Sequence, residues 1–217
     1  MPSPPPTDRD LQDPLPDTPL PLFARWLQEA RACDAIPNPD AMAVATVDEA
    51  GDPQVRLVLC RGFDPDRARF EFFTNYESDK GRQLLAHPRA CCVFHWDPLG
   101  RQVRLSGRVE RTSEARSDAY FASRDPRSQL SAWASRQSRV IGSREALEAE
   151  LAALRDRFGD GVSMPIPRPP GWGGFVVVAE RIELWSAREG RLHDRARWER
   201  TSAEDEALTW RMDRLQP

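Results

Sequence analysis

The sequence predicts a mainly β protein, an antiparallel barrel with peripheral helices. Six or more short segments show the residue pattern that is typical of strands. Short connections, such as the one that holds Gly51 and Pro53, indicate hairpins between neighbouring strands. A doubly wound α/β protein would alternate strands and helices regularly, and this chain does not. Its 217 residues suit a single domain over residues 19–217, preceded by a disordered Pro-rich tail over residues 1–18.

The first half of the chain changes from a helical to a strand period. Thr18 can cap a helix over about residues 19–33, in which the apolar residues recur with helical spacing. Ser78 can cap a second, short helix that Pro88 closes. The other apolar segments predict strands at residues 41–47, 54–61, 69–75, 90–96 and 101–111.

The second half begins with helices and ends with strands. Helical segments are expected near residues 113–123 and 127–135. Ser143 caps the clearest helix, which carries apolar residues on one face and has Gly159 just past its end. After a Pro-rich loop, the pattern predicts strands at about residues 174–186, 192–199 and 207–214.

Composition excludes several classes of protein. The net charge of -3 implies no general attraction to nucleic acid or to acidic membranes. No apolar run approaches the roughly 20 residues that span a bilayer, and no signal peptide is visible, so we expect a cytoplasmic protein. The four cysteines form no CxxC pair and are expected to be reduced thiols. With three histidines in no ligand-like spacing, no metal site is expected.

A cationic motif near the C-terminal end organises the chain. Single residues separate Arg191, His193 and Arg195, so in a strand the three side chains would share one face. Two guanidiniums beside an imidazole suit an anionic, planar ligand, because Arg binds anions through a rigid fork and stacks on flat rings. Trp185 supplies a large flat surface nearby. A solvated edge strand is the alternative interpretation.

Three further segments have the chemistry of a binding site. Thr74, Asn75, Ser78 and Lys80 stand at a strand-to-helix junction, where helix N–H groups, a hydroxyl and an ammonium can bind a phosphate. The alternative is an ordinary helix cap beside a surface Lys. Gln102 lies in a strand of Val, Leu and Arg residues, where its amide could read the polar edge of a ring or simply face solvent.

The last segment suits a second phosphate. Tyr120, Arg124 and Ser128 recur at a spacing of four, and helical spacing places Tyr120 and Arg124 on one face. Their phenol, guanidinium and hydroxyl can all donate hydrogen bonds to an anion. A solvated helix face remains the alternative.

These residues resemble those of the pyridoxamine 5'-phosphate oxidases, also called pyridoxine 5'-phosphate oxidases. The C-terminal signature of that family is a hydrophobic residue, E-x-W, five residues and R-L-H-D-R. Here it reads IELW at 182–185, SAREG, and RLHDR at 191–195. The resemblance runs from about Leu22 to Pro217 and includes FFTNYESDKG, RQVRLSG, AYFASRDPRSQLSAWASRQS, WGGF and DRLQP, in the family's order.

The resemblance implies an FMN-binding split β-barrel that forms a homodimer with FMN at the subunit interface. The family's flavin-contacting positions correspond to Arg56, Arg61, Phe73, Thr74, Lys80, Gln102, Gln137, Ser138, Trp185 and Arg195. The positions that hold the substrate phosphate correspond to Tyr120, Arg124 and Ser128, and Arg61 falls at a position that touches both the flavin and the substrate. The positions beside the substrate ring, expected to be catalytic, correspond to Arg191 and His193.

The chain departs from the family pattern at three of its positions. Arg61 stands where the family usually has Lys. The Arg side chain keeps the positive charge but carries it on a longer, planar group. Asp79 stands where Arg usually precedes Lys80, so it places a negative charge near the expected flavin phosphate. Arg82, three residues on, is a candidate to compensate that charge. Ser186 replaces the usual Gln, His or Gly after Trp185.

The expected activity is the oxidation of pyridoxamine or pyridoxine 5'-phosphate to pyridoxal 5'-phosphate, with dioxygen as acceptor and hydrogen peroxide as product. One alternative is an FMN oxidase of the same fold that acts on another ring, such as a phenazine precursor. Retention of Tyr120, Arg124 and Ser128 argues against it, because a substrate without phosphate would not need them. Another alternative is a flavin-binding protein without catalysis, against which the intact Arg191 and His193 argue.

Overall fold

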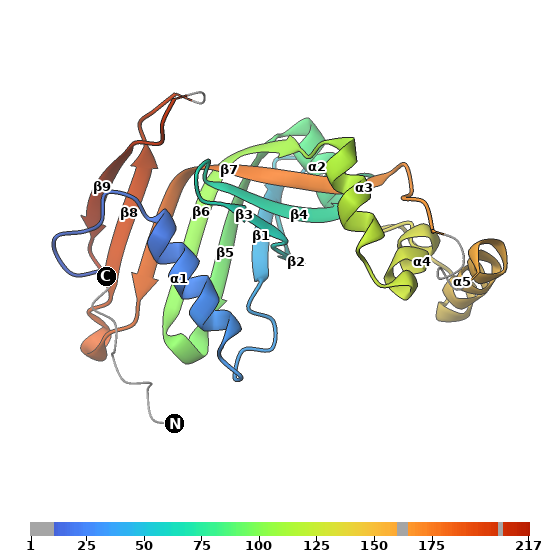
Figure 1. Cartoon of the computed structure of the whole chain (residues 1–217), viewed down its shortest axis with the longest axis horizontal. Coiled ribbons are helices and arrows are strands. Elements are labelled where there is room, and N and C mark those ends of the chain that lie inside the picture. The colour runs from blue at the N-terminus through green and yellow to red at the C-terminus, as the bar shows by residue number, and fades with distance from the viewer. Residues whose placement is uncertain (1–10, 160–164, 204–205) are drawn as a thin grey trace.

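The computed structural model describes residues 11–159, 165–203 and 206–217. Its described strands form one curled, antiparallel sheet with helices at its edges and at one end (Figure 1). The strand order is β2-β1-β5-β6-β7-β4-β3, and β8 and β9 continue the sheet from β7. This arrangement confirms the predicted mainly β fold with peripheral helices.

The elements agree with the predicted periods. The strands are β1 (Ala41–Val47), β2 (Pro53–Leu59), β3 (Gly62–Asp64), β4 (Arg69–Asn75), β5 (Arg89–Trp96), β6 (Arg101–Arg111), β7 (Trp172–Ser186), β8 (Asp194–Arg200) and β9 (Trp210–Leu215). The α-helices are α1 (Leu20–Arg31), α2 (Asp79–Ala86), α3 (Glu114–Ala122), α4 (Pro126–Ala134) and α5 (Arg144–Phe158). Two 3-10 turns, η1 (Asp97–Leu99) and η2 (Glu189–Arg191), complete the described elements.

Helix α1 covers the concave side of the sheet and closes the core. Phe23 and Trp26 are fully buried, because the apolar residues of α1 lie on the one face that meets the strands. The Phe23 ring lies 5.1 Å from that of Phe70 and 5.4 Å from that of Phe94, in the edge-on and tilted arrangements that aromatic rings favour. Packing against α1 therefore holds β4 and β5 in the sheet.

Strand β7 connects two regions of the molecule. Its first half pairs with β4, with Gly173 opposite Thr74, and its second half pairs with β8, with Trp185 opposite Arg195. Along its other edge it pairs with β6 and shifts register near Gly107, where an added Cβ would lie 1.9 Å from a β7 carbonyl oxygen. The glycine permits a bulge that curls the sheet.

Helices α3, α4 and α5 form a lobe at one end of the sheet (Figure 1). A second apolar cluster, separate from the main core, holds this lobe through Phe121, Leu130, Ile166 and Trp172. Apolar residues of α5 pack on it only partly, so that helix is the least buried of the three. Trp172, at the start of β7, ties the lobe to the sheet.

Three details differ from the prediction. Strand β3 was not predicted, because three residues are too short for a periodic signal. Pro19 is the N-cap of α1, so the prediction for Thr18 is wrong by one residue. Residues 1–10 of the predicted tail lie outside the described residues, but residues 11–18 pack on the sheet: Leu11 is buried, and the indole of Trp198 donates to the Pro16 carbonyl.

Candidate active site

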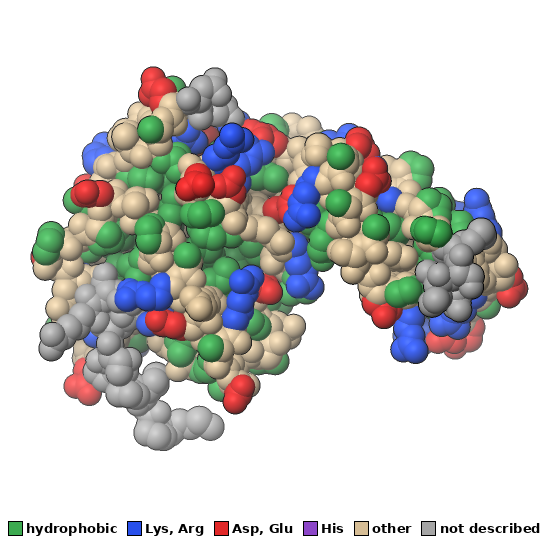
Figure 2. Space-filling view, viewed as in Figure 1, with side chains coloured by type: hydrophobic (Ala, Val, Ile, Leu, Met, Phe, Trp, Pro, Cys, Tyr) green, Lys and Arg blue, Asp and Glu red, His purple; other side chains and the backbone are tan. Residues whose placement is uncertain are grey.

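A pocket of about 840 Å³ lies between the sheet and the helical lobe. Strands β2 and β4, helices α2, α3 and α4, the segment after α4 and the start of β7 supply most of its lining. Figure 2 shows the molecule hollowed between the sheet and the lobe, with Lys and Arg side chains beside the hollow. The lining carries four cations, Arg56, Arg61, Lys80 and Arg124, so the pocket suits an anionic ligand.

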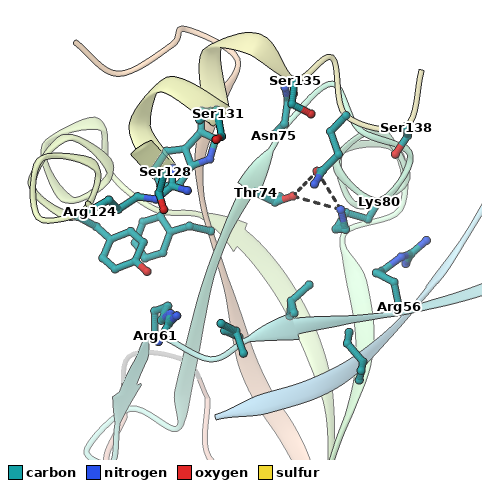
Figure 3. Close-up of a pocket in the computed structure, with 18 of the residues that line it drawn as sticks. Arg56, Arg61, Thr74, Asn75, Lys80, Arg124, Ser128, Ser131, Ser135 and Ser138 are labelled. Atoms are coloured by element: carbon teal, nitrogen blue, oxygen red, sulfur yellow. Dashed lines mark hydrogen bonds between the residues drawn. The ribbon is translucent and has the colours of Figure 1, made fainter. Parts of the chain in front are cut away.

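One end of the pocket is built around Lys80 (Figure 3). The Lys80 ammonium donates to Thr74 Oγ1 at 3.3 Å and to Gln137 Oε1 at 3.0 Å. Ser138 follows in the same segment and accepts from the Asp79 N–H at 3.3 Å. Burial lowers the pKa of Lys80, the charge of Arg56 lowers it further, and Asp79 opposes both effects. A buried ammonium with only neutral hydrogen-bond partners gains from binding an anion.

Local structure explains why these side chains meet. Ser78 caps α2 by accepting from the Gly81 N–H, so it has the structural role that was the alternative interpretation. Gly81 is required because an added Cβ would lie 2.2 Å from the Tyr76 carbonyl oxygen. This tight turn places Lys80 beside Thr74, at the end of β4.

Arg56 lies beside this end on β2, facing the pocket (Figure 3). Its guanidinium donates to Thr46 Oγ1 and, at 3.1 Å, to Gln83 Oε1. Burial lowers the pKa of Arg56, against the opposing charge of Asp79. Two neutral side chains therefore orient Arg56, a second cation, toward this end of the pocket.

Asp79 does not leave a free negative charge in the pocket. Its carboxylate pairs with Arg82 at 2.6 Å, so the compensation considered from the sequence is present in the structure. The pair is half exposed, and both partners remain able to exchange with solvent. Asp79 also lines the pocket, so it still weakens the positive potential there.

The other end of the pocket holds Arg61, Tyr120, Arg124 and Ser128 (Figure 3). Arg124 lies over the Trp172 ring, 4.9 Å from its centroid, and its Nη1 is buried without a hydrogen-bond partner among the described residues. Burial lowers the pKa of Arg124, and the charge of Arg61 lowers it further. Two guanidiniums at one end, one with an unsatisfied N–H, form a site for an oxyanion.

An aromatic wall separates this end from the protein interior. The Phe73 and Tyr120 rings stack at 4.0 Å, and Trp172 lies nearly parallel to both, 5.5 Å from Phe73. Gly174 makes this approach possible, because an added Cβ would lie 2.8 Å from the Phe73 ring. Trp172 was not among the predicted site residues, although its place before two glycines indicates a tightly packed segment.

The remaining predicted residues lie outside this pocket. Gln102 of β6 is opposite Trp185 of β7, which in turn is opposite Arg195 of β8. The Trp185 and His193 rings lie 4.6 Å apart. We call these four residues the C-terminal row. Glu183 accepts from Arg195 at 2.8 Å and 3.1 Å, which holds that guanidinium beside Trp185.

The cationic motif does not form the single strand face that its spacing predicts. Strand β8 begins at Asp194, so Arg191 and His193 are not in a strand with Arg195. Arg191 ends turn η2 with a positive φ of 65° and is exposed. The turn follows Gly190, whose φ is also positive, and glycine favours such a turn over a continued strand. His193 nevertheless reaches the Trp185 ring.

The pocket and the C-terminal row lie at opposite ends of β7. Trp172 lines the pocket and Trp185 belongs to the row, with 13 residue steps between them. At about 3.3 Å per residue the path along the strand is roughly 43 Å. Sheet curl shortens this distance, but a ligand the size of one flavin cannot touch both groups within one chain.

Two negative findings concern the described residues. Within residues 11–159, 165–203 and 206–217, no group of three or more potential ligands could hold a metal ion. No helix in that part of the chain is both long and apolar enough to cross a membrane.

Comparison with protein families gives two matches that together cover most of the chain. Residues 28–158 match the model of the family described as pyridoxamine 5'-phosphate oxidase. Residues 172–217 match the model described as the pyridoxine 5'-phosphate oxidase C-terminal dimerisation region. The first match contains the pocket, apart from Trp172, and the second contains three members of the C-terminal row.

Curated relatives and solved structures agree with these matches. The chain is 48% identical to a pyridoxine/pyridoxamine 5'-phosphate oxidase of Burkholderia lata, covering 92% of this chain and 89% of the relative. It is 49% identical to the Bordetella pertussis protein of the same name, over 92% and 90%. The structure of PhzG from Burkholderia lata, in complex with tetrahydrophenazine-1-carboxylic acid, matches with a TM-score of 0.84 and 30% identity, over 97% of each chain.

A more distant structure supports the fold alone. It is an FMN-binding protein of Nostoc punctiforme, described as related to pyridoxamine 5'-phosphate oxidase. It matches with a TM-score of 0.69 and 19% identity, over 91% of this chain and 96% of the other.

Proposed function

Because the chain belongs to the pyridoxamine 5'-phosphate oxidase family, we propose that it is an FMN-dependent oxidase of B6 phosphates. The substrates are pyridoxamine 5'-phosphate and pyridoxine 5'-phosphate, and the product is pyridoxal 5'-phosphate. Dioxygen is the electron acceptor and is reduced to hydrogen peroxide, while the amine substrate also releases ammonia through hydrolysis of an imine.

One observation carries this proposal: a single pocket has cationic donors at both ends. Lys80, with Thr74 and Ser138, forms one end, and Arg61 with Arg124 forms the other. A flavin mononucleotide and a B6 phosphate each bring one phosphate to such a pocket. Two phosphates at one end would repel each other, so separate donor sets favour binding of both molecules.

The donors at the Lys80 end fit the FMN phosphate. An ammonium, two hydroxyls and the Arg56 guanidinium can together donate to the oxygens of a phosphate dianion. When bound, FMN would supply the chemistry of accepting a hydride from the C4' carbon of the substrate. Gln137 holds Lys80 in place, and Phe73 closes the pocket from the β4 side.

The donors at the Arg124 end fit the substrate phosphate. Arg61 and Arg124 supply charge, while Tyr120 and Ser128 supply hydroxyl donors. The unsatisfied Nη1 of Arg124 gains a partner when the phosphate binds. Anchoring the phosphate orients the ring, and alignment of the reacting carbon then lowers the barrier.

The C-terminal row completes the site in a homodimer. We propose that the partner subunit's Gln102, Trp185 and Arg195 contact the flavin bound in the pocket, because one chain cannot bring them there. The exposed apolar side chains beside the pocket support a second copy at this face, since Leu57 is 73% exposed and Val55 is 69% exposed. The family name of the C-terminal region agrees with this interpretation.

Arg191 and His193 are assigned to the substrate ring. The Arg188 N–H donates to His193 Nδ1 at 3.1 Å, so the neutral imidazole carries its proton on Nε2. His193 therefore offers an N–H donor that places the ring, and its Nδ1 is not available to take a proton. Arg191 supplies a flat cation that stacks on the pyridine.

Subunit mixing tests the shared site. Arg124→Leu removes a pocket residue and His193→Asn removes a residue from the other half. Mixed dimers of the two variants contain one intact site, so random mixing should restore about one quarter of the wild-type activity, measured at substrate concentrations well below the KM of the Arg124→Leu variant. Arg124→Leu mixed with a second pocket variant, Ser128→Ala, is the control and should restore none. Failure of the first mixture to exceed the control would refute a site shared between subunits.

A second candidate is oxidation of a carboxylated tricyclic ring. The structural similarity to PhzG, solved with tetrahydrophenazine-1-carboxylic acid, favours testing it. Arg61 and Arg124 could pair with a carboxylate as well as a phosphate. Comparison of kcat/KM for the two substrate classes decides between them, and we expect the B6 phosphates to be preferred because Tyr120 and Ser128 add donors that a carboxylate cannot fully use.

A further inference from the structure

An ion pair lies behind the aromatic wall, outside the pocket. Arg116 of α3 donates through Nε to both carboxylate oxygens of Glu71 on β4, at 3.1 Å and 3.0 Å. The Glu71 side chain is only 12% exposed and that of Arg116 is 45% exposed. Neither residue lines the pocket, and neither has a role in the proposed function.

This pair continues the contacts of the wall. Glu71 and Phe73 are two residues apart on β4, and Arg116 and Tyr120 are four apart on α3, so each pair lies on one face of its element. Phe73 stacks on Tyr120, and the Arg116 guanidinium lies 5.5 Å from the Phe73 centroid and 6.0 Å from that of Tyr120. An ion pair and an aromatic pair together set how α3 sits on β4.

Both cations of the substrate end are linked to the residues of this contact. Arg124 directly follows α3 and its cap, so the position of α3 decides where that guanidinium lies. On the strand side, the Glu71 carbonyl accepts from the Arg61 N–H at 2.7 Å. Gly62 lies beside it, and an added Cβ there would lie 2.8 Å from Glu71 Oε2. Glu71 is thus connected to Arg61 by its backbone and to Arg124 through α3.

We propose that Arg116 is a positioning residue for substrate binding. Its pairing with Glu71 sets the separation of the Arg61 and Arg124 guanidiniums, and that separation determines the affinity for the substrate phosphate. Arg116 touches neither ligand and takes no part in the chemistry. The inference rests on the assignment of this end of the pocket to the substrate phosphate.

The contact should affect one end of the pocket and not the other. The Lys80 end is built on α2, β2, the segment after α4 and Thr74 at the far end of β4, and none of the hydrogen bonds described for it involves Glu71 or Arg116. Loss of the pair should therefore weaken phosphate binding at the substrate end and leave the affinity for FMN unchanged. A merely structural role would lower stability without separating these two affinities.

The test compares two Arg→Gln variants in the FMN-loaded dimer. Arg116→Gln breaks the pair under study, and Arg69→Gln breaks a matched pair from the same face of β4, Arg69 with Glu110 at 2.8 Å. Steady-state kinetics give KM and kcat for pyridoxamine 5'-phosphate, and calorimetry gives the Kd of inorganic phosphate. For Arg116→Gln we expect both KM and the phosphate Kd to rise about tenfold, since small displacements at a site are costly, with kcat within about twofold.

The controls separate the possible outcomes. Arg69→Gln should leave KM and the phosphate Kd unchanged, and Arg116→Lys, which keeps the charge, should recover part of the loss. Equal values in Arg116→Gln and Arg69→Gln would overturn the proposal, as would a loss in kcat alone. If Arg116→Gln does not fold, a wild-type phosphate Kd in Arg116→Lys and Glu71→Gln would overturn it.

The proposed function fails separately from this inference. Absence of turnover by the wild-type protein would refute the oxidase assignment, whereas the phosphate Kd of the variants would still report on the geometry of the pocket.

Discussion

Replacing Arg124 with Leu should weaken substrate binding strongly while costing little stability. The Arg124 side chain is partly buried and packs on Trp172 at 4.9 Å, and its Nη1 is buried without a partner among the described residues. A buried donor without a partner costs about 1–3 kcal/mol. The cation–π contact returns roughly 0.5–2 kcal/mol. These terms nearly cancel, so the free energy of unfolding should change by no more than about 1 kcal/mol.

The loss in substrate binding should be much larger. A hydrogen bond to a charged group contributes about 1.5–3 kcal/mol, and each 1.4 kcal/mol is a factor of ten. The value of kcat/KM for pyridoxamine 5'-phosphate should therefore fall about 10-fold to 100-fold, chiefly through KM, because the phosphate is remote from the reacting carbon. Steady-state kinetics and thermal unfolding of the FMN-loaded variant measure the two effects.

Arg168→Leu provides the contrast. The Arg168 side chain is 10% exposed but pairs with Glu114 and with Asp118. Its removal leaves Asp118 without an ion-pair partner among the described residues and Glu114 with Arg111 alone, so it should lower the unfolding temperature more than Arg124→Leu does. The reasoning would be refuted if Arg124→Leu lost as much stability as Arg168→Leu while its kcat/KM stayed at the wild-type value.

Four further predictions concern FMN binding, the stability of the apoprotein and the dimer. FMN affinity should fall as the pH rises toward the pKa of Lys80. That pKa is lowered from the ordinary value of 10.5, so the ammonium loses its charge at a lower pH than a free Lys does. A fluorescence titration of Lys80→Met should not show this fall. The stability of the apoprotein should change in the opposite direction, rising with pH over the same range, because the unfolded chain binds more protons there. Asp79→Arg should tighten FMN by about 1 kcal/mol, since the charge is partly exposed, and a looser complex would contradict the placement of Asp79. Leu57→Asp, at a 73% exposed position, should give a monomer in analytical ultracentrifugation, and an unchanged dimer mass would mean that another face pairs.

Residue patterns predicted most elements because their signals are local. Ser78 and Ser143 were identified as caps from the sequence, and both accept the predicted hydrogen bonds from the third residue of their helices. Strand β6 has the predicted bounds. Strand β3 and turn η2 could not be predicted in this way. A three-residue strand forms only by pairing with a neighbouring strand, and the turn through Gly190 depends on contacts elsewhere in the chain.

The site was less predictable than the fold. Spacing grouped Tyr120 with Arg124, and both line the pocket, but no local signal joins that segment to Lys80 or to Arg61. The wall formed by Phe73, Tyr120 and Trp172 comes from three distant segments, so only tertiary packing reveals it. The pairing of Glu71 with Arg116 spans 45 positions in the sequence and has no signal in either segment.

Turnover of pyridoxamine 5'-phosphate in the presence of oxygen tests the central claim most directly. The purified protein is saturated with FMN and mixed with the substrate, and the absorbance of pyridoxal 5'-phosphate is followed together with hydrogen peroxide. We predict that the two products form in equal amounts and that Arg191→Leu reduces kcat/KM by two to three decades, about 3–4 kcal/mol. A folded, FMN-loaded protein that forms neither product would contradict the proposed function.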